Sequence, residues 1–187
     1  MSGITPFQTV GPYFGIMARW RRSSPQVTDA TTGARIAIGG QVFDGEGTPI
    51  PDALVETWQA DANGRYRHPD DRRSNPPADP AFDGYGWMHT RKDGSFTFNT
   101  VKPGRVPGPD GRDQAPHVLV SILARGILTR FVTRLYFEDE PATASDPILA
   151  LVPESRRHTL IARRTSDSRY TFDVVMQGPQ ETVFFDV

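Results

Sequence analysis

Residues 102–126 read KPGRVPGPDGRDQAPHVLVSILARG, and this stretch guides the interpretation of the rest of the chain. Its first half is rich in proline and glycine, which excludes a helix or an inner strand. From His117 it becomes a run of valine, leucine and isoleucine, which predicts a buried strand. Because side chains alternate along a strand, one face is expected to carry His117, Leu119, Ser121, Leu123 and Arg125. In one interpretation this face lines a pocket; in the other, His117 opens an ordinary core strand that ends in solvent at Arg125.

The composition limits the classes of function. A chain of 187 residues can bury the core of one domain, and its formal net charge of −1 gives no electrostatic case for binding nucleic acid or an anionic membrane. The absence of cysteine excludes disulfides, thiolate metal sites and a cysteine nucleophile. No signal peptide and no apolar stretch of membrane-spanning length is recognisable, so we expect a cytoplasmic protein.

The pattern of short apolar runs separated by Gly- and Pro-rich turns predicts a mainly β protein, an antiparallel β-sandwich with long loops and little helix. We expect a domain over residues 35–187 and an N-terminal arm over residues 1–34, whose apolar side chains pack on a partner chain. The expected strands are residues 35–43, 53–60, a hairpin over 87–100, 117–123, 128–138, 169–177 and 181–186. Helical turns are expected at 147–151 and 154–162.

The candidate metal donors are few. Two tyrosines with two histidines would suit ferric iron, and a His-x-His pattern on a strand would direct both imidazoles into one site. This chain offers Tyr66 in a long polar loop and His117 on the strand, but Leu119 stands where the second histidine would be. Val106, in the preceding loop, is apolar. The residue types therefore supply only part of an iron site.

Several motifs together identify a family. The segments ALVETWQADANGRY, VKPG, APH, LARG, TRLYFED and ETVFFD occur in one order over nearly the whole chain. In this order they resemble the intradiol ring-cleaving dioxygenases. The resemblance implies a β-sandwich, and an enzyme that opens the ring of a catechol with O2 and non-haem Fe(III). Within that family the sequence looks like the α chain of a two-chain enzyme, and this resemblance implies cleavage of protocatechuate to 3-carboxy-cis,cis-muconate in the catabolism of aromatic compounds.

The same resemblance implies roles for particular residues. Tyr66 and His117 occupy two of the four ligand positions of the catalytic members, whereas Val106 and Leu119 occupy the other two, and Gln114 replaces a catalytic arginine. Fe(III) is accordingly expected on the partner β chain, with Tyr66 and His117 as remnant positions and no catalytic residue in this chain alone. The expected contribution of this chain is substrate binding, through Thr9, Gly11, Pro12, Tyr13 and Arg125.

Physical chemistry agrees with most of these assignments. A guanidinium suits the carboxylate of protocatechuate by charge and by its forked donors, although Arg125 could equally bond a carboxylate of an interface. A Gly-Pro turn lets the backbone approach a ring closely, and Tyr13 would add an aromatic wall. Two alternatives remain open at this point. One is a β-sandwich binding or scaffold module without catalysis; the other is a homomeric enzyme with a remodelled iron site.

Overall fold

The computed structural model describes residues 26–108 and 110–186. The four expected substrate-binding residues of the arm, Thr9, Gly11, Pro12 and Tyr13, lie outside these ranges. Residues 26–34 contact their own domain, since Gln26 is buried and its Nε2 donates to Thr57 Oγ1 and to the Gly84 carbonyl oxygen, each at 3.2 Å. No helix in the described ranges is long and apolar enough to cross a membrane.

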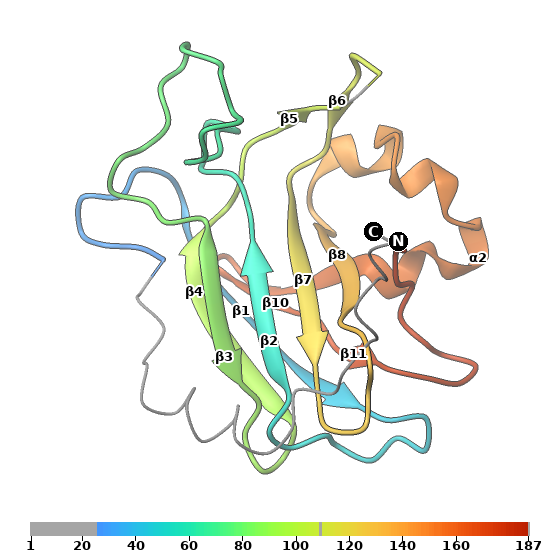
Figure 1. The fold of residues 1–187 in the computed structure, drawn as a ribbon. Coiled ribbons are helices and arrows are strands. Elements are labelled where there is room, and N and C mark those ends of the chain that lie inside the picture. Colours follow the sequence, from blue (N-terminus) through green and yellow to red (C-terminus); the bar gives the residue numbers. More distant parts are fainter. Residues whose placement is uncertain (1–25, 109, 187) are drawn as a thin grey trace, which may run out of the picture.

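The strands of the described residues follow one another along most of the chain (Figure 1). In order they are β1 (Arg35–Phe43), β2 (Leu54–Trp58), β3 (Tyr85–His89), β4 (Ser95–Val101), β5 (Val106–Pro107), β6 (Asp113–Gln114), β7 (His117–Leu123), β8 (Phe131–Phe137), β9 (Ile161–Ser166), β10 (Arg169–Thr171) and β11 (Val174–Val175). Short helical turns lie between β8 and β9: η1 (Pro141–Ser145), η2 (Leu149–Leu151), α2 (Glu154–Arg157) and η3 (His158–Leu160).

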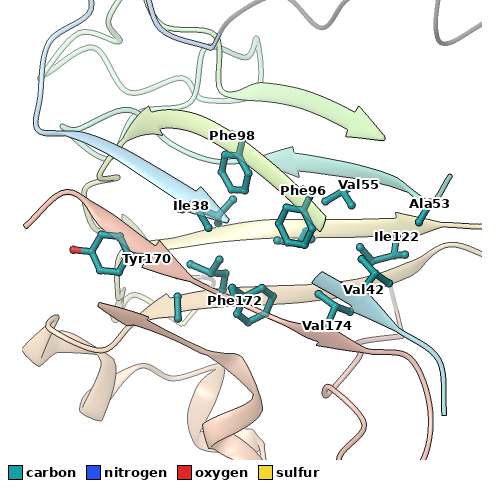
Figure 2. Packing of buried hydrophobic residues seen from close by; sticks show 14 of the residues in the cluster. Ile38, Val42, Ala53, Val55, Phe96, Phe98, Ile122, Tyr170, Phe172 and Val174 are labelled. Atoms are coloured by element: carbon teal, nitrogen blue, oxygen red, sulfur yellow. The ribbon is translucent and has the colours of Figure 1, made fainter. Parts of the chain in front are cut away.

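A nine-stranded sheet forms the body of the domain, in the order β11-β1-β10-β9-β8-β7-β2-β3 with β4 paired to β1. Side chains from β1 and β4 meet those of β2 and β7 in one apolar core, so the sheet folds into two packed layers (Figure 2). The expected β-sandwich is therefore confirmed. Most ladders are antiparallel, as expected, but β1 pairs with β10 and β11, and β8 with β9, in parallel.

The core follows from the alternation of side chains along the strands. On β7, Val118, Val120 and Ile122 are at most 1% exposed and face the other layer, while the side chains between them point to the outer face. Gly40 on β1 permits a close approach between strands, because a Cβ there would lie 1.8 Å from the Phe172 carbonyl oxygen. Burial of this apolar surface is the main stabilising term of the fold.

The prediction that residues 87–100 form a β-hairpin is wrong. The tight turn does form, since the Arg91 amide donates to the Ser95 carbonyl at 2.8 Å and the Gly94 amide donates to the Arg91 carbonyl at 2.9 Å. The two flanking strands do not pair, however: β3 pairs with β2 and β4 pairs with β1. The chain thus crosses from one layer to the other at this turn.

The end of the chain also differs from expectation in detail. The helical turn expected over 154–162 ends at Leu160, and Ile161 begins β9, a strand that the pattern did not predict. The run 169–177 divides into β10 and β11. The run 181–186 forms only an isolated bridge, between Phe185 and Val132.

Candidate functional site

The long loop after β2 begins with a buried carboxylate that fixes its course. Asp61 is 3% exposed, and its Oδ1 accepts from the amides of Asn63 at 2.8 Å and Arg65 at 2.9 Å. Its Oδ2 accepts from the Asp79 amide at 2.8 Å, which ties the far end of the loop to the near end. Gly64 has a φ of 74°, and a Cβ there would lie 1.8 Å from the Arg105 carbonyl oxygen.

Arg65 holds the middle of this loop from inside. Its side chain is 3% exposed and its Nε donates to Asp71 Oδ2 at 3.0 Å, while its terminal nitrogens donate to the carbonyls of Arg73 and Pro76. Arg73 also donates to Asp71, at 2.7 Å. The hydrogen bonds from Arg73 and Arg65 hold the pKa of Asp71 far below its usual range. The loop therefore has a defined conformation next to Trp58.

Tyr66 lies against the end of β2. Its ring stacks on Trp58 with centroids 5.7 Å apart and an interplanar angle of 9°. Burial raises the pKa of the Tyr66 hydroxyl, and the nearby Arg134 opposes this shift only in part. The phenol is therefore neutral at physiological pH. Tyr66 is, in this chain, an uncharged aromatic wall.

His117, at the start of β7, is 4% exposed. Its Nδ1 lies 2.7 Å from the Ala115 carbonyl oxygen, and because a carbonyl only accepts, Nδ1 is the protonated nitrogen. Burial lowers the pKa of His117 to about 4, and the positive charge of Arg134 acts in the same direction. The imidazole is therefore neutral and held in one tautomer.

Arg134, which sequence reasoning did not single out, joins these groups. It lies on β8 in register with Leu119 of β7, and its Nη1 donates to Gln114 Oε1 at 2.7 Å. The same nitrogen lies 3.4 Å from the hydroxyl of Tyr136. Both partners are neutral, and no carboxylate forms an ion pair with Arg134 in the described part of the chain. The sequence did contain one indication of this position, because alternation along β8 predicts that Arg134 and Tyr136 lie on the same face of the strand.

The described residues do not fit an iron ion. Val106 is 4% exposed and Leu119 is half-buried, and both side chains are hydrocarbon and cannot bind a hard cation. Tyr66 and His117 remain as donors, the first as a neutral phenol and the second through its unprotonated Nε2, so the described residues supply two donors where the resemblance implies four. A guanidinium that acts electrostatically on both of them adds repulsion of any cation. In the described ranges no group of three or more His, Asp or Glu side chains could hold a metal.

Arg125 lies away from these residues. It follows the opposite end of β7, and six residue steps along that strand separate its two ends by about 20 Å. In Figure 1 the loop after β2 and the β5–β6 pair lie at the upper end of the sheet, whereas β7 runs to the lower end. The Arg125 side chain is 65% exposed, with Asp52 Oδ2 at 3.9 Å. The fold thus does not bring Arg125 to Tyr66 and His117.

Comparison with known proteins defines the class. Residues 9–178 match the model of a dioxygenase family, described as Dioxygenase. The chain belongs to this family, the intradiol ring-cleaving dioxygenases, which are oxidoreductases. A solved structure, the dioxygenase domain of a carbohydrate-binding fusion from Streptomyces sp. SirexAA-E, is similar with a TM-score of 0.62 and 31% identity, over 93% of this chain and 98% of that one.

Among curated proteins, the protocatechuate 3,4-dioxygenase α chain of Burkholderia cepacia is 42% identical over 98% of this chain and 97% of its own length. The corresponding α chain of Pseudomonas putida is 40% identical over 97% of this chain and 96% of its own. The β chain of the Burkholderia cepacia enzyme is also similar, with 38% identity over 80% of this chain and 67% of that chain. In that organism the two chains are separate proteins, and both are similar to this chain.

Proposed function

We propose that this chain is the α subunit of a heteromeric protocatechuate 3,4-dioxygenase, which cleaves protocatechuate with O2 to 3-carboxy-cis,cis-muconate. The observation that carries this proposal is the 42% identity to an α chain over 98% of the sequence. The partner is a β chain of similar fold, which holds the Fe(III). The enzyme serves the catabolism of aromatic compounds in the cytoplasm.

The role of this chain in that enzyme is to complete the substrate pocket of its partner. A residue that serves a site on another chain has to be accessible when that chain is absent, and the Arg125 side chain is 65% exposed. Its contact with Asp52 at 3.9 Å is a surface ion pair, which contributes at most about 1 kcal/mol. The guanidinium can therefore exchange this contact for a substrate carboxylate, which it binds through two parallel hydrogen bonds.

The arm would supply the rest of the pocket. Thr9, Gly11, Pro12 and Tyr13 remain the proposed contacts, with the Gly-Pro turn allowing close approach of the backbone and Tyr13 providing an aromatic wall. The arm up to residue 34 is proposed to be part of the interface with the β chain. When bound on the partner, Fe(III) supplies Lewis-acid activation of the catechol ring toward O2. The residues of this chain hold the substrate in position for that chemistry.

The first experiment compares the chain expressed alone with the chain expressed together with its β chain. The expected result is a solo chain without iron, and a heteromer that contains iron, absorbs visible light and consumes O2 with protocatechuate. A solo chain with stoichiometric iron and full activity would refute the proposal in favour of a homomeric enzyme.

A second experiment tests Arg125 in the heteromer. Since a hydrogen bond to a charged group contributes about 1.5–3 kcal/mol, Arg125→Gln should raise KM for protocatechuate about 10- to 100-fold. Cleavage of catechol, which has no carboxylate, should change little. Arg163→Gln is the matched control, because Arg163 is an exposed arginine on β9. If Arg125→Gln and Arg163→Gln gave the same kinetics, the chain would be a scaffold rather than part of the pocket.

A further inference from the structure

A pocket of about 750 Å³ lies beside the end of β2, between the long loop and the β5 strand. Trp58, Tyr66, Val106 and Pro107 line its apolar side, and His68 with residues 70–73 its polar side. Pockets that bind small molecules typically enclose about 300–1,000 Å³ and combine apolar walls with a few polar groups. This pocket is separate from Arg125, which lies beyond the other end of β7.

The walls of the pocket are aromatic and ordered. Trp58 and Tyr66 are stacked at 5.7 Å, and His68 meets the Trp58 ring edge-on with centroids 6.2 Å apart. The hydrogen bonds of Arg65 and Asp71 fix the loop that carries Tyr66. A preformed aromatic surface binds a planar ring by stacking, with little loss of side-chain entropy.

Among the charged residues at the pocket, Arg65, Arg72 and Arg73 outnumber Asp70 and Asp71, which favours an anion. Asp71 is neutralised by the guanidinium groups of Arg65 and Arg73. Arg72 is exposed, and its side chain has no hydrogen bond or ion pair among the residues that the structure describes. Arg134 donates to the neutral side chains of Gln114 and Tyr136, has no carboxylate partner among the described residues, and acts on Tyr66 as a positive charge. A cation without a carboxylate partner, partly removed from water, gains most from an anionic ligand.

We propose that this pocket binds a small planar aromatic carboxylate, with the ring against Trp58 and Tyr66 and the carboxylate toward Arg72. The pocket has the hydrocarbon side chain of Val106 where a metal would need a donor, so the proposed binding uses no metal. An αβ heteromer would then hold two equivalents of an aromatic acid, one at the partner's iron and one here. The proposal does not depend on the role of Arg125, since it concerns the isolated chain.

The test is calorimetric titration of the full chain, without its partner, using three probes. Benzoate has ring and charge, benzamide has the ring alone, and cyclohexanecarboxylate has the charge alone. Benzoate should bind with one site per chain and at least tenfold more tightly than either of the others. Arg72→Ala should weaken benzoate binding at least tenfold, and Arg134→Gln should weaken it as well, while Arg163→Ala leaves it unchanged.

Other results would overturn the proposal. Absence of benzoate binding to the folded full chain would show that the pocket is not a site for this ligand class. Equal affinity for benzoate and cyclohexanecarboxylate would exclude stacking on Trp58 and Tyr66. If Arg72→Ala and the control Arg163→Ala weakened benzoate binding equally, the loss of affinity would come from the lower net charge of the chain and not from a contact with Arg72. Since both arginines are exposed, neither variant is expected to disturb folding.

Discussion

Replacement of Asp146 by alanine should destabilise the domain more than other single polar substitutions near the remnant site. Asp146 is 1% exposed, and its Oδ1 accepts from the Tyr136 hydroxyl at 2.9 Å and from the amides of Ile148 and Leu149 at 2.9 and 2.8 Å. Its Oδ2 accepts from the Ala115 amide at 2.7 Å. The carboxylate therefore links the residues before β7, strand β8 and the helical turns after β8.

The magnitude follows from the donors that the variant leaves behind. Each buried donor without an acceptor costs about 1–3 kcal/mol, and the four contributions are not additive because they share one group. We expect Asp146→Ala to lower the free energy of unfolding by about 3–5 kcal/mol, a large part of the 5–15 kcal/mol typical of a domain. Tyr136→Phe removes one donor and leaves the carboxylate satisfied by three amides, so it should cost about 1 kcal/mol.

The assay is equilibrium unfolding in urea of the full chain and of both variants at pH 7. Comparable slopes of free energy against urea concentration would show that the variants unfold from a native state of similar compactness. The difference between the two variants reports the combined cost of losing the carboxylate and leaving the three amides without an acceptor. If Asp146→Ala cost no more than Tyr136→Phe, water would replace the carboxylate, and the reasoning that it connects these elements would be refuted.

Three further predictions concern the same end of the molecule. Because the pKa of His117 is lowered to about 4, the unfolded chain takes up a proton that the folded chain does not. Stability should therefore fall by about 3 kcal/mol as the pH drops from 6.5 to 4, and His117→Gln, followed by thermal unfolding, should remove that part of the pH dependence. Gly64→Ala should cost about 3 kcal/mol or more, since its Cβ would lie 1.8 Å from a carbonyl oxygen, whereas the control Gly47→Ala, with nothing within 4 Å, should cost about 1 kcal/mol in urea unfolding. Arg65→Lys loses the forked donors inside the long loop and should make it several-fold more sensitive to limited proteolysis, which the exposed substitution Arg91→Lys should not do.

The sequence predicted the sandwich because its strong signals were local. Alternation on β7 and β8 places Val118, Val120 and Leu135 in the core, where each is at most 1% exposed. The hairpin over 87–100 failed for a different reason. A turn sequence determines only that the chain reverses direction, and pairing depends on which layer accepts each strand. Phe96 and Phe98 of β4 are buried in the core from the β1 side, so β4 joins the other layer.

The parallel pairing of strands and the short strands β9, β10 and β11 could not be predicted from the local pattern of apolar residues. β9 carries Arg163 and Arg164 and is mostly exposed, so no hydrophobic periodicity marks it as a strand. Its place in the sheet comes from its neighbours, since Tyr136 pairs with Ile161 and Tyr170 with Arg164. Such contacts join residues distant in the sequence, and their energy is a property of the assembled sheet.

For the candidate site, the sequence alone predicted those properties that depend on the chemical type of one side chain. Val106 and Leu119 have no lone pair to offer a metal, whatever their position. Arg134 required the structure, because its importance comes from lying in register with Leu119 and donating to Gln114. Neither contact leaves a signature in the local sequence.

The two ends of β7 show how one strand can carry two different roles. At its start, His117 is neutral and 4% exposed, and the groups around it are bonded to one another. Beyond its other end, the Arg125 guanidinium is 65% exposed, and its ion pair among the described residues is a long one, to Asp52 Oδ2 at 3.9 Å. A site that is complete within one chain satisfies its polar groups internally, whereas a group that serves a second chain has to leave its charge accessible. The proposed division of labour follows from this contrast: the chain keeps its remnant positions inside and offers Arg125 to its partner.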